Sequence, residues 1–210
     1  MLRLADFLAR STANGPGVRS VVWVQGCARA CPGCFNPEMQ DPEAGELVSE
    51  DDLVARIRAA GSEGVTFSGG EPFDQAPALA RIASALRDDG LSVICYSGFT
   101  LEELLASRAE GVGTLLAACD VLVDGPFVEA LQVASALGGS SNQRVIPLTD
   151  RYSTTDLTAA PVAELAFDSG SSISTQSPGL HRRSPPLTTA PAADSELASM
   201  PSPLPAVVIS

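Results

Sequence analysis

Apolar residues recur along the first 150 residues in two alternating patterns, one typical of strands and the other of helices. Short β-branched or continuous apolar runs predict strands at 18–24, 64–67, 91–96, 121–123 and 144–146. Apolar residues at helical spacing predict helices over 50–60 and 77–89, each followed by a glycine. Ser49 and Asp52 resemble a capping box at the start of the first of these helices, and Thr100 and Glu103 have the spacing of one at the start of another helix. Repeated strand–helix units indicate an α/β fold with a mostly parallel sheet.

The length of this region and a late change in composition predict the domain organisation. A complete eight-fold barrel needs around 250 residues, so we expect an open or partial βα barrel. From residue 169 onward the chain holds seven of its 16 prolines and no Phe, Trp, Tyr or Cys. Such a segment buries too little apolar surface to offset the entropy of ordering it. We therefore expect a folded domain over 1–168, with a short helix around 162–167, and a disordered tail over 169–210 that contains His181.

The charge balance excludes several classes of partner. The chain has 13 basic residues, all of them Arg, and 25 acidic residues, which give a net charge of −12. A nucleic-acid or anionic-membrane surface is normally met by a basic protein surface, so neither partner is expected. No apolar run approaches the roughly 18 residues of a transmembrane helix, and the N-terminal sequence has no signal-peptide pattern. We expect a soluble cytoplasmic protein.

Three of the five cysteines lie within eight residues, directly after the first of these predicted strands. Cys27, Cys31 and Cys34 have the spacing C-x3-C-x2-C, which allows three thiolates on one loop to converge on a metal centre. Three ligands are one short of the four of a structural zinc site or a fully protein-bound iron–sulfur cube. The missing ligand would leave one position open to a substrate. Cys95 and Cys119 lie in or beside apolar runs and are interpreted as buried small hydrophobic residues.

The cysteine loop has two other interpretations. Cys31 and Cys34 form a C-x-x-C pair of the kind found in thiol–disulfide oxidoreductases, but this function leaves Cys27 unexplained. A structural zinc site would need Cys95, Cys119 or His181 as its fourth ligand, and none of these is close in sequence. An iron–sulfur cluster with one open iron is therefore the favoured hypothesis.

Two motifs resemble those of the radical S-adenosylmethionine superfamily. The loop over 25–36 has the C-x3-C-x2-C spacing followed by an aromatic residue, Phe35. The segment 67–72 has the sequence FSGGEP, ends the next predicted strand and is similar to the superfamily's Gly-Gly-Glu-Pro turn. The resemblance implies that a 4Fe-4S cluster and S-adenosylmethionine are the cofactors, and that the iron ligands are Cys27, Cys31 and Cys34.

The same resemblance implies a set of contacts to S-adenosylmethionine. Gly69, Gly70 and Glu71 would hold the methionine end, and Phe35 would lie near the adenine. The complete set of candidates is Phe35, Gly69, Gly70, Glu71, Ser97, Asp124 and Asn142. Of these, Asp124 is also interpretable as a turn-forming residue before Gly125.

Four further segments resemble the glycyl-radical-enzyme activases, and in particular the group that activates anaerobic ribonucleoside-triphosphate reductase. They are NGPGVR at 14–19, SGFTLEEL at 97–104, DVLVDGPF at 120–127 and GSSNQR at 139–144. The chain departs from the group at Gly138, where Arg is usual, and at Pro126, where some relatives have Lys. Its Pro- and Ser-rich tail is a further difference.

The resemblance implies an enzyme that reductively cleaves S-adenosylmethionine to a 5′-deoxyadenosyl radical, which then removes hydrogen from a backbone glycine of a partner enzyme. The implied partners are a glycyl radical enzyme or another protein substrate, and an electron donor such as flavodoxin or ferredoxin. Two alternatives stay open: a radical maturase acting on another protein or peptide, and a non-catalytic iron–sulfur subunit for electron transfer. The absence of a second cluster motif from the sequence disfavours the maturase.

Overall fold

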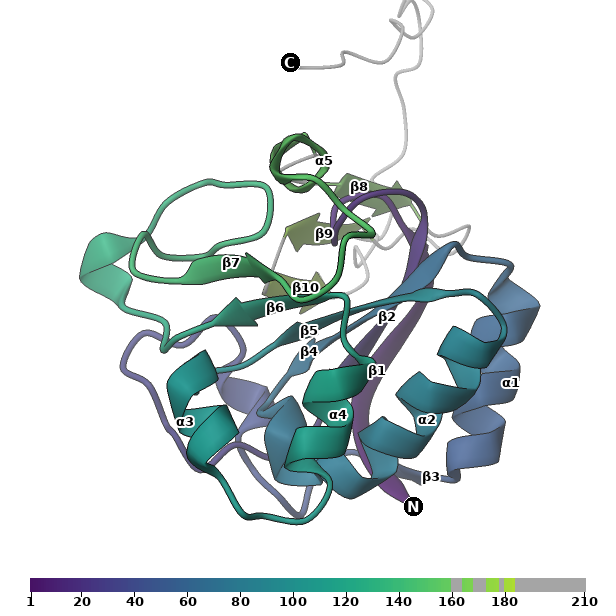
Figure 1. Cartoon of the computed structure of the whole chain (residues 1–210). Helices are drawn as coiled ribbons and strands as arrows, with labels where there is room; N and C mark the ends of the chain where they lie inside the picture. The colour runs from purple at the N-terminus through teal and green to yellow at the C-terminus, as the bar shows by residue number, and fades with distance from the viewer. Residues whose placement is uncertain (160–163, 168–172, 178–179, 184–210) are drawn as a thin grey trace, which may run out of the picture.

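In a computed structural model, the chain forms a seven-stranded sheet with the order β3-β1-β2-β4-β5-β6-β7 (Figure 1). Residues 1–159, 164–167, 173–177 and 180–183 are described. The strands are β1 (Leu2–Ser11), β2 (Arg19–Val24), β3 (Glu46–Val48), β4 (Gly64–Gly69), β5 (Ser92–Tyr96), β6 (Val121–Asp124) and β7 (Arg144–Pro147). The four central strands β2, β4, β5 and β6 are parallel, and the outer strands pair antiparallel. The α/β class is confirmed, whereas this sheet does not confirm a partial barrel.

The helices pack mainly on one face of the sheet, where Figure 1 shows α1, α2 and α4 side by side. They are α1 (Glu50–Ala60), α2 (Ala76–Asp88), α3 (Leu101–Ala106), α4 (Val112–Ala118) and α5 (Thr154–Thr158), with short 3-10 helices η1 (Pro37–Met39), η2 (Pro72–Gln75) and η3 (Glu129–Leu131). Cys95 and Cys119 are fully buried in the core under these helices, as predicted. No helix in the described ranges is both long and apolar enough to span a membrane.

Alternation along the central strands gives the sheet a second apolar face. In β5, Val93 and Cys95 belong to the core under the helices, whereas Ile94 and Tyr96 pack with Leu137 on the opposite side. This alternation follows from the pleat, which directs successive side chains to opposite faces. On this second face, Leu137 of the loop between β6 and β7 and Leu157 of α5 pack against β5 and β6, and Met39 of η1 packs against β2.

The helix boundaries follow the capping signals in the sequence. Ser49 accepts a hydrogen bond from the Asp52 amide at 3.0 Å and caps α1, and Gly61 ends it with a left-handed backbone at φ 60°. Thr100 and Glu103 form the predicted capping box of α3. Caps of this type satisfy the free amides of the first helical turn, which explains why local sequence located both helices.

Several elements differ from the sequence-based expectations. The strands β1 and β3 and the helix α4 were not predicted. Residues of β8 (Glu164–Phe167), expected to be helical, instead pair antiparallel with β9 (Ile173–Ser177), which also pairs with β10 (Leu180–Arg183). The expected helix is therefore wrong at Glu164–Phe167, because pairing with a neighbouring strand overrides local preference. β9 and β10 lie within the segment expected to be disordered, and the remainder of 169–210 lies outside the described residues.

The motif at 14–19 lies at the amino ends of the parallel strands. The guanidinium of Arg19, fully buried at the start of β2, donates hydrogen bonds to Thr66 Oγ1 at 2.8 Å, Ser92 Oγ at 2.7 Å and the Val65 carbonyl at 2.6 Å. Burial lowers the pKa of Arg19, and no carboxylate in the described part of the chain forms an ion pair with it. This motif therefore joins β2, β4 and β5 at the edge opposite their carboxyl ends.

Candidate metal and cofactor site

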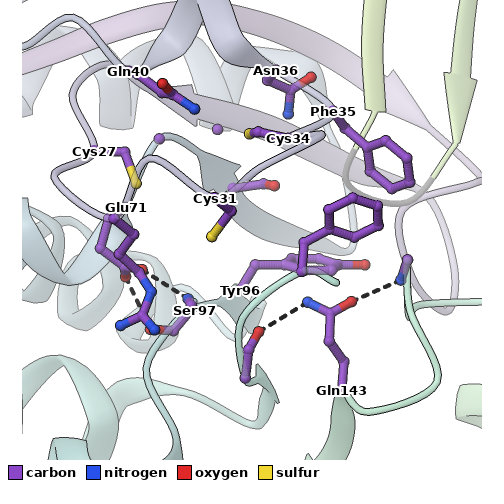
Figure 2. Close-up of a pocket in the computed structure, with 18 residues that line it drawn as sticks. Cys27, Cys31, Cys34, Phe35, Asn36, Gln40, Glu71, Tyr96, Ser97 and Gln143 are labelled. Carbon is purple, nitrogen blue, oxygen red and sulfur yellow. Dashed lines mark hydrogen bonds between the residues drawn. The ribbon is translucent and has the colours of Figure 1, made fainter. Parts of the chain in front are cut away.

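A pocket lies at the carboxyl ends of the four parallel strands (Figure 2). Its walls come from the loops that follow each of them: the cysteine loop after β2, Gly69–Glu71 after β4, Ser97 and Gly98 after β5, and Gly125 and Phe127 after β6. The crevice outside the carboxyl ends of parallel strands is where α/β sheets bind ligands. The fold therefore brings four sequence-distant loops to one binding site.

Cys27, Cys31 and Cys34 all line this pocket as partly buried free thiols. Figure 2 shows the three side chains in the upper and central part of the view, with Glu71 and Tyr96 below them. Within the described ranges, no three His, Cys, Asp or Glu side chains converge closely enough to count as a metal-ion site. The fit to an iron–sulfur cluster therefore rests on donor chemistry, because three soft thiolates facing one pocket are the ligands that such clusters use.

The cysteine loop is held in place by backbone hydrogen bonds. The Cys27 amide donates to the Gln40 carbonyl at 3.0 Å, and the Cys34 amide donates to the Cys31 carbonyl at 3.2 Å. Ala30 and Gly33 have positive φ angles of 46° and 69°, which turn the chain between the cysteines. Burial raises the pKa of Cys27, and the amides of Arg29 and Ala30 act in the opposite direction. Both amides would therefore stabilise a thiolate at this position.

The Gly-Gly-Glu turn packs directly against the start of the cysteine loop. A Cβ atom on Gly70 would lie 2.2 Å from the Gly26 carbonyl oxygen, and one on Gly69 would lie 2.5 Å from the Val24 backbone. The amide of Glu71 donates to that same Gly26 oxygen at 2.9 Å. The two glycines were predicted, with Glu71, to hold the methionine end of S-adenosylmethionine. The structure shows in addition that they allow close approach of another stretch of protein backbone, which joins the two sequence motifs.

Glu71 is 1% exposed and connects the turn after β4 to the loop after β5. Its carboxylate accepts hydrogen bonds from the Phe73 amide at 3.0 Å, the Ser97 hydroxyl at 3.0 Å and the Gly98 amide at 2.8 Å. Burial raises the pKa of Glu71 to about 7, although these hydrogen bonds oppose the rise. Glu71 and Ser97, both predicted as cofactor contacts, therefore line the pocket as one hydrogen-bonded pair.

An aromatic pair forms another wall of the pocket. The rings of Phe35 and Phe127 have centroids 4.3 Å apart and are tilted by 41°. Beside them, Gln143 accepts hydrogen bonds from the amides of Gly139 at 2.9 Å and Ser140 at 3.2 Å, and donates to the Gly125 carbonyl at 3.1 Å. The Gln143 amide thus ties the loop after β6 to the segment that leads into β7. This wall is apolar and suited to a flat aromatic group.

Two of the predicted cofactor contacts lie outside the pocket lining. Asp124 is fully buried and accepts hydrogen bonds from the Leu101 amide at 2.6 Å and from Arg144 Nε at 2.9 Å. The exposed Asn142 donates to the Pro126 carbonyl at 2.8 Å. Asp124 therefore anchors α3 and Arg144, and Asn142 stabilises the adjoining loop.

Other lining residues were not among the predicted contacts: Arg29, Asn36, Gln40, Ser68, Tyr96, Gly98, Gly125, Phe127, Gly139 and Gln143. Several of them lie inside the motifs at 97–104, 120–127 and 139–144, so the motif positions contained a usable signal. Gln40 and Tyr96 lie outside every motif and had none. The predicted contacts that do line the pocket are Cys27, Cys31, Cys34, Phe35, Gly69, Gly70, Glu71 and Ser97.

The comparisons agree with this arrangement. A family model described as a 4Fe-4S single cluster domain matches residues 13–146, a range that contains every pocket-lining residue. The anaerobic ribonucleoside-triphosphate reductase-activating protein of Escherichia coli K12 is 32% identical over 145 residues, which cover 63% of this chain and 90% of the relative. The proteins of that name from Salmonella typhi and Pasteurella multocida are 29% and 31% identical, covering 69% and 70% of this chain and 97% and 99% of the relatives.

Proposed function

The chain belongs to the 4Fe-4S single cluster domain family, and we propose that it is a radical S-adenosylmethionine enzyme that generates a glycyl radical on a partner enzyme. One observation carries this proposal. The three-cysteine loop and the Gly-Gly-Glu turn line the same pocket, and the backbone contact between Gly26 and Gly70 joins them. The relatives' role as activating proteins supports the glycyl-radical part of the proposal.

The proposed cluster ligands are Cys27, Cys31 and Cys34. Three cysteines would bind three of the four irons of a 4Fe-4S cluster. The fourth iron would have no protein ligand and would be open to a molecule bound in the pocket. When bound, the cluster would supply the electron that cleaves S-adenosylmethionine into methionine and a 5′-deoxyadenosyl radical. The protein contributes the ligands, the shape of the pocket and the exclusion of water.

The remaining walls would position S-adenosylmethionine. Gly69 and Gly70 line the pocket beside the cysteine loop, where the methionine end of the ligand would lie. Glu71 and Ser97 hold the neighbouring loops together through their hydrogen bond. Phe35 and Phe127 would enclose the adenosyl group in an apolar wall, where a reactive radical is shielded from solvent.

The proposed protein substrate is anaerobic ribonucleoside-triphosphate reductase, because the relatives are activating proteins of that enzyme. An electron donor such as flavodoxin or ferredoxin and a cytoplasmic location stay predictions. The Gly138 and Pro126 departures lie beside the pocket, in the loop between β6 and β7. A different glycyl radical partner would therefore be accommodated most simply by changes in this loop.

The proposal is tested with protein reconstituted and reduced by dithionite without oxygen. We expect methionine and 5′-deoxyadenosine in equal amounts, and an electron paramagnetic resonance signal of a glycyl radical once the reductase is added. C27A, C31A and C34A should each lose the cluster and both products. C95A removes a buried cysteine outside the pocket and should retain them. If protein with a full cluster forms no 5′-deoxyadenosine, the proposed enzymatic activity is contradicted. The electron-transfer subunit would then be the favoured alternative.

A further inference from the structure

Arg29 brings a positive charge into the pocket without an acceptor for it. It lies between Cys27 and Cys31, and no other pocket-lining residue is cationic. Its Nε atom is buried without a hydrogen-bond partner, and no carboxylate in the described part of the chain forms an ion pair with its guanidinium. A buried donor without an acceptor is unfavourable, which indicates that the acceptor comes from a bound molecule.

The neighbouring loop holds the Arg29 side chain in position. The guanidinium carbon lies 4.7 Å from the centroid of the Phe99 ring, within the range of a cation–π interaction. A Cβ atom on Gly98 would lie 2.4 Å from Arg29 Cδ and 2.6 Å from Nε, so the stem of the side chain occupies the space that Gly98 leaves. Arg29 is therefore oriented before any ligand binds.

The nearby carboxylates are engaged elsewhere. Glu71 is on the same side of Gly98, but its oxygens already accept hydrogen bonds from Phe73, Ser97 and Gly98. Asp74 and Glu103 interact with Arg29 only through longer-range electrostatics. Among the described residues, no carboxylate occupies the guanidinium donors, which leaves them to an anion from outside the chain.

We propose that Arg29 binds the carboxylate of the methionine part of S-adenosylmethionine, an inference that rests on the proposed function. This carboxylate is the one anionic group of that molecule, whose sulfonium and amino groups are both cationic. Guanidinium groups bind carboxylates through paired, charge-assisted hydrogen bonds. Because Arg29 lies between two of the proposed iron ligands, it is placed to meet the end of the ligand that approaches the cysteine loop.

The test measures binding rather than turnover. Equilibrium dialysis gives the dissociation constants of S-adenosylmethionine and of its decarboxylated form for the reconstituted protein. R29Q should weaken binding of S-adenosylmethionine by about tenfold or more and leave the decarboxylated form unchanged, since only the former carries the carboxylate. R29K should lose less affinity for S-adenosylmethionine than R29Q, because lysine keeps the positive charge although it lacks the paired donors of arginine. R58Q, which removes an exposed arginine of α1 that pairs with Asp89 and does not line the pocket, is the matched control.

The outcomes separate this inference from the proposed function. If wild-type protein with a full cluster does not bind S-adenosylmethionine, the proposed function fails. If wild type binds it and R29Q binds it equally well, the role of Arg29 is overturned while the function stands. Iron and sulfide contents are measured for each variant. If R29Q loses iron, the affinities of R29K for the two ligands are compared instead. An equal loss of affinity for both ligands would overturn the inference, and a loss of affinity for S-adenosylmethionine alone would support it.

Discussion

Gly70 lies so close to Gly26 that a Cβ atom on it would be 2.2 Å from the Gly26 carbonyl oxygen. Gly26 immediately precedes the first proposed iron ligand, and Gly70 lies in the turn proposed to hold the methionine end. The hydrogen bond from the Glu71 amide to the same oxygen fixes the two segments relative to each other. The position of the cysteine loop therefore depends on the turn after β4.

Replacing Gly70 by Ala should displace the cysteine loop. The added methyl group would clash with backbone atoms, which cannot move aside as a side chain can. This clash should lower the free energy of unfolding by roughly 1–3 kcal/mol. We expect G70A to fold with reduced stability and to retain much less iron after reconstitution. Gly113 of α4 provides the control, because nothing lies within 4 Å of its Cβ position, and G113A should be neutral or slightly stabilising. Iron content and urea unfolding check both variants, and equal iron contents would contradict the coupling.

Arg19 should matter for stability and not for the pocket. R19M leaves the Thr66, Ser92 and Val65 acceptors without their buried donor, so we expect a loss of about 3 kcal/mol or more. Chemical unfolding measures this loss. The folded fraction should still take up iron and bind S-adenosylmethionine like the wild type, because Arg19 lies at the opposite ends of the strands. A stable variant with impaired ligand binding would assign this motif to the site instead.

The raised pKa of Glu71 predicts a pH dependence of stability. The folded protein holds this proton up to about pH 7, whereas the ordinary pKa is 4.5, so the folded state binds more protons between these values. The free energy of unfolding should therefore fall as the pH rises from 4.5 through 7, by on the order of 3 kcal/mol. E71Q should lack this fall.

Urea unfolding at pH 5 and pH 7.5 compares E71Q with wild type at matched cluster content. E38Q changes an exposed glutamate of η1, and its profile should run parallel to that of the wild type. Parallel profiles for E71Q and wild type would show that Glu71 has an ordinary pKa in the folded protein.

Asn142 and Gln143 should respond differently to substitution despite being adjacent. Q143A removes the acceptor of the Gly139 and Ser140 amides and the donor to Gly125, and should weaken binding of S-adenosylmethionine by about tenfold. N142A removes one exposed hydrogen bond to Pro126 and should change binding by less than about threefold. Equilibrium dialysis compares the dissociation constants of the two variants for S-adenosylmethionine. A larger loss of affinity in N142A than in Q143A would indicate that Asn142 contacts the ligand directly.

Features encoded by short-range patterns were predictable from the sequence. The Ser49 and Thr100 caps were located because capping residues lie three positions apart in the chain. The pocket-lining cysteines and the Gly-Gly-Glu turn were located because each forms a contiguous motif. In contrast, β1 has two irregularities in its pairing with β2, which interrupt the alternation that identifies a strand.

Contacts between distant segments were not predictable in this way. The Gly26–Gly70 contact explains the need for a double glycine, but it is created by the parallel pairing of β2 with β4. Tyr96 and Gln143 reach the pocket through the pairing of β5, β6 and β7 and the loops between them. The ion pair of Asp124 with Arg144 likewise joins β6 to β7, and no short-range pattern in the sequence indicates it.

The open iron is tested most directly by Mössbauer spectroscopy of protein reconstituted with iron-57, with and without S-adenosylmethionine. Three thiolates on a cube of four irons leave one iron to be coordinated by the ligand. We therefore expect the parameters of about a quarter of the iron to change when S-adenosylmethionine is added. A spectrum that the ligand leaves unaltered, or purified protein that contains zinc in place of iron, would contradict the account.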